Sequence, residues 1–241
     1  MLKIENLTKI YGEKKAVDAL SLHIQAGEIF AFIGHNGAGK TTTLKACCGI
    51  LAFEEGEIFV DGVSVKENPL ACKQKIAYLP DNPDLYGFMS GVQYLNFVAD
   101  VFKVGKEVRK ERIEKYAEIF SLSGDLGQQI SAYSHGMKQK LALIGALLHE
   151  PKLLIMDEPF VGLDPKAAFL VKEIMKELCA KGSAVFFSTH VLDVAEKLCD
   201  KVAIIQGGKL IKQGTMSEVK GDKSLEKVFL ELVDKGEKEN A

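Results

Sequence analysis

The sequence predicts an α/β fold, with a mainly parallel sheet flanked by helices, an N-terminal antiparallel β subdomain and an inserted α-helical subdomain. Two observations support this prediction. Short apolar strand patterns alternate with helical patterns in the first and last thirds of the chain, and the block from about residue 89 to 148 is helical in its periodicity. The 241 residues suffice for one large domain, or for one domain with an inserted lobe.

The elements follow one another in a clear order. We expect strands over 2–10, 21–33 and 56–62, with a helix over 40–50 after the glycine-rich loop. After the helical block come a strand segment at 152–159, a helix at 165–181, a strand segment at 184–190, a helix at 191–199 and a hairpin over 201–214, which turns at Gly207-Gly208. The last eight residues, "DKGEKENA", are predicted to fray.

The composition excludes several classes of protein. A hydrophobic content of 47%, a charged content of 27% and a net charge of −2 describe an ordinary soluble protein without a basic nucleic-acid footprint. The lysine-rich run near 106–115 alternates with glutamates and predicts a solvated helix face. Apolar runs are too short for a membrane span, the first twelve residues lack a signal-peptide pattern, and five cysteines without a C-x-x-C predict buried thiols. We therefore expect a cytosolic protein.

A glycine-rich loop, "GHNGAGKT", lies between an apolar strand and a helix. This spacing is typical of a phosphate loop, in which backbone N–H groups and the helix N-terminus bind phosphate oxygens. Lys40 would reach the β- and γ-phosphates, and Thr41 would offer its hydroxyl to Mg²⁺. The predicted cradle consists of Gly34, His35, Asn36, Gly37, Ala38, Gly39, Lys40, Thr41 and Thr42. The loop predicts a P-loop NTPase core.

Two acids end the apolar strand "LLIMDEP". Because neighbouring side chains on a strand point to opposite sides, Asp157 and Glu158 are predicted to have different tasks. Asp157 would hold Mg²⁺ through its water shell, and Glu158 would polarise the attacking water.

A second candidate site lies near the end of the helical block, in the segment "AYSHGMKQKLAL". Ser134 is a natural N-cap there, and Gly136 permits close approach to the backbone. Such a helix start predicts an anion site.

These motifs, in this order, resemble those of the ATP-binding cassette (ABC) ATPases over nearly the whole chain. "YSHGMKQ" resembles the signature motif, "PFVGLDP" the D-loop and "FFSTH" the switch-histidine segment. The resemblance implies a single domain over 1–241: a nucleotide-binding core (1–87 and 151–214), a helical subdomain (88–150) and a C-terminal helix and tail (215–241). It also implies ATP, Mg²⁺ and head-to-tail pairing, with each ATP between one chain's phosphate loop and the other's signature motif.

The resemblance assigns further roles. Ser134 and Gly136 would bind the γ-phosphate of ATP held by the partner, while Lys40, Glu158 and His190 would be catalytic. Asp164 would cross to the facing subunit, although it also fits an N-cap before Pro165. Tyr11 would stack on adenine, although an aromatic at a strand end also fits a core position. Asp81 stands where the family has Gln or Glu, so a water bridge to Mg²⁺ is favoured over direct contact; His135 replaces a signature glycine.

The chain most resembles short cassettes of bacterial exporters of the drug-efflux and Ecs-type branch. This implies an ATP-hydrolysing subunit on the cytoplasmic face of the inner (cell) membrane. It would drive a separate transmembrane permease and pair with a second cassette as a homodimer or heterodimer. A cluster of Leu85, Tyr86, Phe88 and Met89 suits a permease helix, or the core of the lobe. The alternatives are a soluble ABC ATPase acting on ribosomes or DNA and a nucleotide-gated regulator; a GTPase is disfavoured because no N-K-x-D segment follows the loop.

Overall fold

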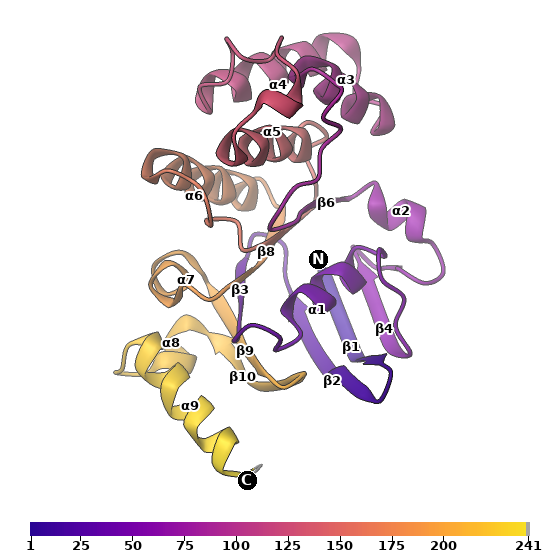
Figure 1. Cartoon of the computed structure of the whole chain (residues 1–241). Helices are drawn as coiled ribbons and strands as arrows, with labels where there is room; N and C mark the ends of the chain where they lie inside the picture. The colour runs from indigo at the N-terminus through magenta and orange to yellow at the C-terminus, as the bar shows by residue number, and fades with distance from the viewer. Residues whose placement is uncertain (240–241) are drawn as a thin grey trace.

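The computed structural model describes residues 1–239, with side chains through Val233, and contains two sheets (Figure 1). The first, antiparallel, has the order β2-β1-β4-β5 and the second has the order β10-β9-β3-β8-β7-β6. The strands are β1 (Leu2–Tyr11), β2 (Lys14–Ile24), β3 (Ile29–Ile33), β4 (Glu55–Val60), β5 (Val63–Ser64), β6 (Ile76–Leu79), β7 (Leu153–Asp157), β8 (Ala184–Thr189), β9 (Lys201–Gln206) and β10 (Lys209–Thr215).

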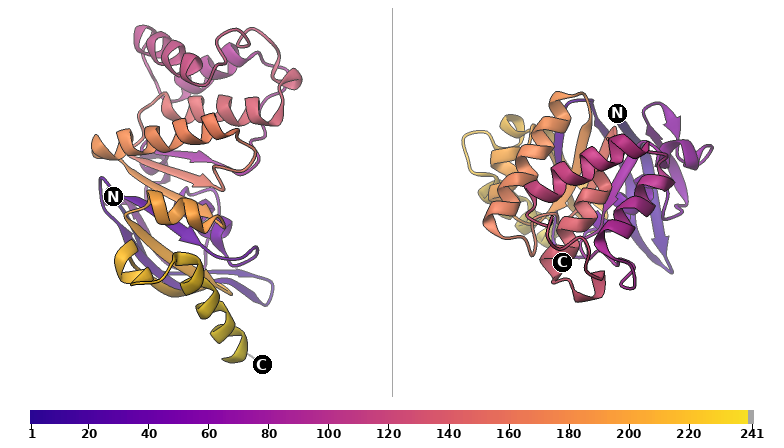
Figure 2. Two further views of the ribbon diagram at one scale, coloured as in Figure 1. Left: turned by 90° about the vertical axis from the view of Figure 1, so that its left-hand side faces the viewer. Right: turned by 90° about the horizontal axis from the view of Figure 1, so that it is seen from above.

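Helices cover the second sheet and form a separate lobe above it. They are α1 (Lys40–Cys47), α2 (Pro69–Lys73), α3 (Gly91–Val101), α4 (Lys106–Ile119), the 3₁₀ turn η1 (Ile130–Ala132), α5 (His135–Leu147), α6 (Pro165–Ala180), α7 (Leu192–Leu198), α8 (Met216–Lys220) and α9 (Leu225–Glu239). The lobe of α3, α4 and α5 stands at the top of Figure 1 and in the left view of Figure 2. The chain enters it after β6 and leaves it for β7, the parallel neighbour of β6. The predicted fold class is confirmed.

The second sheet is parallel from β9 through β6, and only β10 runs antiparallel to its neighbour. Strands β3, β7 and β8 are buried along their whole length, as expected for a sheet covered on both faces. Consecutive residues such as Phe186 and Phe187 therefore belong to different cores, one shared with α1 and the antiparallel sheet and one shared with α6 and the helical lobe. Parallel strands bring their carboxyl ends to one edge, where ligands of open α/β sheets bind.

Two sequence predictions need correction. The predicted strand over 21–33 is two strands in different sheets: β2 pairs with β1, and β3 pairs with β8 and β9. The turn between them contains Gly27 at φ 83°, a conformation that costs glycine little. The predicted frayed tail is helical as far as Glu239, where α9 ends, and residues 240–241 lie outside the described residues.

The remaining expectations about composition can be compared with the described residues. All five cysteines are free and buried, as predicted. The lysine-rich helix α4 buries only Ile113, Tyr116 and Ala117, so most of its surface is solvated. Among residues 1–239, no helix combines the length and the hydropathy that crossing a bilayer requires.

A half-buried histidine lies where the helical lobe returns to the sheet. His149, between α5 and β7, stacks on Phe102 with ring centroids 3.6 Å apart, and its Nε2 lies 3.2 Å from the carbonyl oxygen of Ile76. Since a carbonyl oxygen only accepts, Nε2 carries the proton of the neutral ring. Burial lowers the pKa of His149 to about 4, against the hydrogen bond to Ile76, which raises it.

This histidine predicts acid sensitivity of the fold. Between pH 6.5 and about 4, the unfolded imidazole binds a proton that the native ring does not, so lowering the pH favours unfolding. From pH 7 to pH 5, wild type should lose about 1 kcal/mol more stability than His149→Gln, allowing for partial exposure. Urea unfolding at both pH values measures the difference. Equal losses in the two proteins would contradict the assignment.

A candidate nucleotide site at the carboxyl ends of β3, β7 and β8

The loop between β3 and α1 is framed closely by other segments. A Cβ atom on Gly34 would lie 2.5 Å from the carbonyl oxygen of Ile205, and one on Gly39 would lie 2.4 Å from that of Ala16. Gly39 also has φ 108°, and therefore both positions require glycine. The N–H of Gly208, in the β9–β10 turn, donates to the carbonyl of Ala38 at 3.0 Å. β2 and the β9–β10 hairpin thus pack against the loop and fix its backbone.

A cavity of about 450 Å³ opens over this loop. Its lining comprises Tyr11, Lys14, Ala16, His35, Asn36, Gly37, Gly39, Lys40, Thr41, Thr42, Asp81, Asp157 and Glu158. Eleven of these thirteen residues are site residues predicted from the sequence, all but Lys14 and Ala16. Gly34, Ala38, His190, Ser134, Gly136 and Asp164 are predicted site residues that do not line it.

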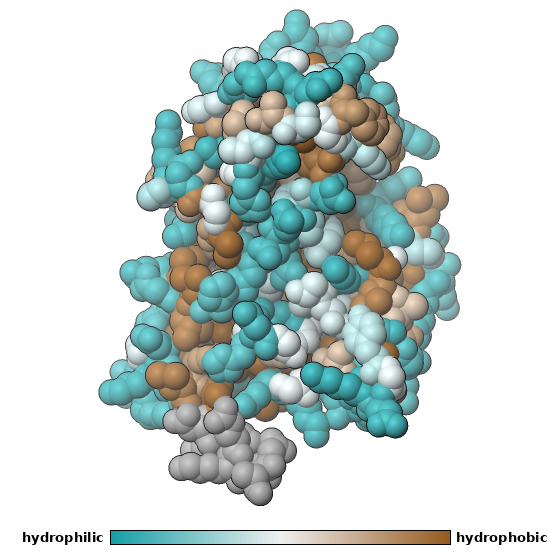
Figure 3. Space-filling view, in the orientation of Figure 1, coloured by the Kyte–Doolittle hydropathy of each residue, from teal (hydrophilic) through white to brown (hydrophobic). Residues whose placement is uncertain are grey.

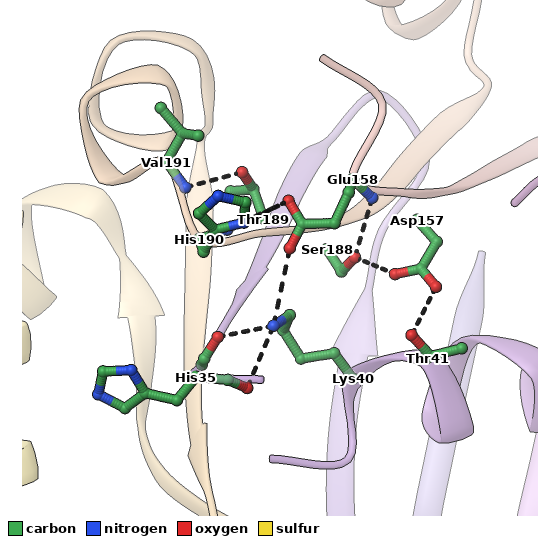
Figure 4. Close-up of polar contacts among 10 residues, drawn as sticks. His35, Lys40, Thr41, Asp157, Glu158, Ser188, Thr189, His190 and Val191 are labelled. Carbon is green, nitrogen blue, oxygen red and sulfur yellow. Dashed lines mark hydrogen bonds and ion pairs between the residues drawn. The ribbon is translucent and has the colours of Figure 1, made fainter. Parts of the chain in front are cut away.

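Lys40 is held by the loop from which it comes. Its ammonium donates to the carbonyl oxygens of Gly34 at 2.7 Å and His35 at 3.3 Å, and it lies 3.7 Å from Oε1 of Glu158 (Figure 4). The residue is only 6% exposed. A buried ammonium is stabilised by anionic oxygen atoms, and the cavity has space for a ligand that supplies them.

Asp157 connects the three converging segments. Its Oδ2 accepts from the hydroxyl of Thr41 in α1 and its Oδ1 from the hydroxyl of Ser188 in β8, both at 2.5 Å. Asp157 is 4% exposed, so these two donors compensate for the water that its carboxylate has lost. Ser188 also accepts from the N–H of Glu158 at 3.1 Å. Ser188 is not among the site residues predicted from the sequence, although its place at the buried end of "FFST" is a signal for it.

Glu158 faces the same cavity as Asp157, but the physical reason differs from the one predicted. β7 ends at Asp157, and Glu158 adopts φ 48°, a left-handed conformation that is rare for residues with a side chain. A turn, and not strand alternation, sets the direction of its carboxylate. Its Oε2 lies 3.0 Å from Nδ1 of His190 and accepts from that residue's N–H at 3.3 Å. Its Oε1 is buried and makes no hydrogen bond.

Tyr11 and Asp81 stand at the rim of the cavity. Tyr11, at the end of β1, is 51% exposed, with the Lys9 ammonium 5.1 Å from the centre of its ring. The core alternative for this aromatic is therefore wrong. Asp81 is exposed and lines the cavity after β6.

The segment "SHGMKQK" packs on the D-loop of its own chain. Ser134 caps α5 by accepting from the N–H of Met137 at 3.3 Å, as predicted. A Cβ atom on Gly136 would lie 3.4 Å from the carbonyl oxygen of Gly162. Asp164 caps α6, accepting from Ala167, and pairs with Lys140 at 2.8 Å. The predicted N-cap roles of Ser134 and Asp164 are thus confirmed.

The cavity suits a divalent cation that is bound largely by phosphate. Mg²⁺ takes oxygen ligands, usually one or two from the protein together with substrate phosphates and water. The paired oxygens of Thr41 and Asp157 match that donor set. Within the described part of the chain, no group of three His, Cys, Asp or Glu side chains forms a metal site by itself. The residues present fit Mg²⁺ delivered with a nucleotide.

The fold and the loop together define a P-loop NTPase core. Residues 17–161 match the ABC transporter family. The ABC transporter ATP-binding protein YxlF of Bacillus subtilis is 41% identical, covering 91% of this chain and 72% of YxlF. The linearmycin resistance ATP-binding protein LnrL of the same organism is 34% identical, over 91% of this chain and 70% of LnrL.

A solved structure gives the same result. The structure described as that of an ATP-binding subunit of an ABC transporter superposes with a TM-score of 0.93 at 32% identity, covering 97% of this chain and 99% of the other. The chain therefore belongs to the ABC transporter family, as an ATP-binding subunit with ATPase activity.

Ser188 supplies a prediction for this site. Ser188→Ala removes the donor to Asp157 and the acceptor for the Glu158 N–H, and should lower kcat for ATP roughly ten- to hundredfold, as expected for a bond to a charged group. Steady-state ATPase assays measure this effect. Ser183→Ala is the matched control, because its hydroxyl donates to the Pro151 carbonyl outside the cavity. Equal kcat values for the two variants would contradict the role of Ser188.

Proposed function

We propose that this chain is the ATP-hydrolysing subunit of an ABC exporter, which drives a separate membrane permease through ATP-dependent head-to-tail dimerisation. It would work on the cytoplasmic face of the cell membrane. The observation that carries the proposal is the convergence of Lys40, Asp157 and Glu158 at one cavity of about 450 Å³. The domain division proposed from the sequence, with the core at 1–87 and 151–214, the lobe at 88–150 and the C-terminal part at 215–241, assigns this cavity to the core.

The phosphate loop would bind the β- and γ-phosphates of ATP. Gly37 and Gly39, both at positive φ, let successive N–H groups point into the cavity at the start of α1, where the helix dipole favours anions. Lys40 would release part of its contact with loop carbonyls and turn to phosphate oxygen. Mg²⁺, when bound, supplies charge neutralisation on the phosphates; Thr41 and Asp157 would hold it, with Asp81 reaching it through water. Tyr11, exposed at the rim, would stack on adenine.

Glu158 would orient and polarise the attacking water. Because Oε2 is already bound by His190, Oε1 is the oxygen that would accept a hydrogen bond from that water; it makes no hydrogen bond and lies 3.7 Å from the Lys40 ammonium. The Lys40 ammonium lies 3.7 Å from Oε1 of Glu158, so a cation would stand beside the carboxylate whether or not phosphate is bound. His190, 57% exposed on its side chain, would complete the site as a donor to the γ-phosphate.

The cavity of one chain does not include the Ser134 and Gly136 groups that would bind the far side of the γ-phosphate. Ser134 and Gly136 lie outside the cavity lining, with Gly136 against the D-loop, so a second copy or a related cassette would have to provide them. Backbone and hydroxyl donors at the start of α5 would then act in trans, as preorganised stabilisers of charge. Asp164, which is fixed by Lys140 and by its capping bond, would bring the D-loop to the same interface.

An exposed aromatic group supports a permease partner. Tyr86 lies 5.9 Å from Phe88 and 5.8 Å from Phe97 between ring centroids, and Phe88 is 75% exposed. A groove of about 420 Å³ is lined mostly by apolar side chains from α2, β6, the end of α3 and the segment after α1, together with Lys73 and Gln74. Figure 3 shows apolar side chains at the surface over α2 and over the α3 side of the lobe. An amphipathic cytoplasmic helix of a permease fits such a surface. The resistance role in the name of LnrL favours export.

ATP-dependent pairing is the first test. Glu158→Gln keeps the geometry of the site but should stop hydrolysis, so ATP would hold two chains together. We expect a shift from monomer to dimer in size-exclusion chromatography with ATP, and none with ADP, which lacks the γ-phosphate contacts. A variant that binds ATP and remains monomeric would contradict self-pairing.

Permease docking gives a second test. Phe88→Ala should leave the ATPase activity of the isolated protein unchanged and weaken binding to a co-expressed candidate permease about tenfold, as for a central aromatic contact. Phe169→Ala on α6, where the side chain is 60% exposed, is the matched control. Co-purification in detergent measures both. Equal retention of the two variants would exclude the aromatic group from the interface.

A further inference from the structure

The C-terminal helix reaches the phosphate loop. The ring of Phe229 in α9 lies 4.9 Å from the imidazole of His35 between centroids, with the planes inclined by 56°. Phe229 is only 7% exposed, whereas His35 is exposed and lines the nucleotide cavity. One residue of the cavity wall therefore contacts an element that otherwise lies outside the site, at the lower left of Figure 1.

His35 makes contacts through its backbone and, separately, through its ring, and its carbonyl oxygen accepts from the N–H of Ala38 at 3.1 Å. Its carbonyl oxygen accepts from Lys40 at 3.3 Å, while its imidazole points away from Lys40 and from the acids (Figure 4). The inner parts of the loop, Gly34 and Gly39, are fixed by backbone neighbours, as described above. Residues 35–37 are exposed, and Gly37 has nothing within 4 Å of a built Cβ atom. The contact with Phe229 thus supports the outer corner of the loop, which is its least confined part.

α9 is itself well anchored. Leu225 is fully buried, and its N–H donates to Oε2 of Glu196 in α7 at 2.8 Å. Gln206, at the end of β9, donates from its amide to the carbonyl of Val233 at 3.4 Å. Because both ends of this stretch are tied to the core, Phe229 is a firm support and not a mobile lid.

We infer that Phe229 is a positioning residue for nucleotide binding: through His35 it sets the conformation of residues 35–37 that presents their N–H groups to phosphate. The C-terminal helix then takes part in nucleotide affinity without touching the nucleotide. This inference rests on the proposed role of residues 34–42 as the phosphate loop.

A double-mutant cycle tests it, with the affinity for the fluorescent analogue MANT-ATP as the readout. His35→Ala and Phe229→Leu should each raise Kd about two- to tenfold, the range expected for loss of an aromatic contact. The double variant should bind no more weakly than the weaker single variant, because both changes remove one contact. Phe229→Tyr keeps the ring and should bind as wild type does. Leu230→Ala, at a side chain 52% exposed on the same helix, is the control.

The outcomes separate a positioning role from a structural one. A general loss of stability would lower the melting temperature and add to the effect of His35→Ala, so additive changes in Kd would overturn the inference. Equal Kd values for Phe229→Leu and Leu230→Ala would also overturn it. If Phe229→Leu folds poorly, Phe229→Met completes the cycle with a side chain of similar volume. Wild type that does not bind MANT-ATP, with Lys40→Ala no different, would instead overturn the proposed phosphate loop.

Discussion

The site depends on one carboxylate that holds three segments together. Asp157 ends a strand buried on both faces and accepts hydrogen bonds from Thr41 at the start of α1 and from Ser188 at the end of β8. A carboxylate this buried requires such donors, and the donors fix where the phosphate loop stands relative to the acids. If Asp157 were unpaired, the desolvation cost would disfavour the folded arrangement, and the distance between Lys40 and Glu158 would no longer be set by the sheet.

Glu158, the residue after Asp157, has a left-handed backbone conformation that follows from the position of both acids. The chain must turn sharply as it leaves β7 so that two consecutive acids face one cavity, and the left-handed conformation of Glu158 makes this turn. Two contacts stabilise that conformation: the N–H of Glu158 donates to the Ser188 hydroxyl, and its Oε2 accepts from the N–H of His190 and lies beside that residue's Nδ1. Strain held by surrounding contacts at a functional position is a recurrent feature of active sites, and here Oε1 of Glu158 is left buried without a hydrogen bond.

Much of the fold could be predicted from local patterns, because apolar strands followed by polar turns specify a covered parallel sheet. The glycine-rich loop and the two acids were found for the same reason: their chemistry is encoded in contiguous residues. Features that depend on three-dimensional proximity were missed. Residues 21–33 look continuous until sheet partners divide them, Ser188 matters only because Asp157 lies beside it, and the contact between His35 and Phe229 joins distant parts of the chain. Strand alternation does not apply to Asp157 and Glu158, because β7 ends at Asp157 and both acids line one cavity.

The central claim is that a complete ATP site needs two chains, one giving Lys40 and the other Ser134. Mixing Lys40→Ala with Ser134→Arg tests this most directly, because each variant alone should be inactive. A head-to-tail heterodimer of the two contains one intact site and one doubly damaged site. With random pairing, the mixture should recover roughly a quarter of wild-type ATPase activity, rising with protein concentration. No recovery, although both variants fold and pair, would contradict a site shared between chains.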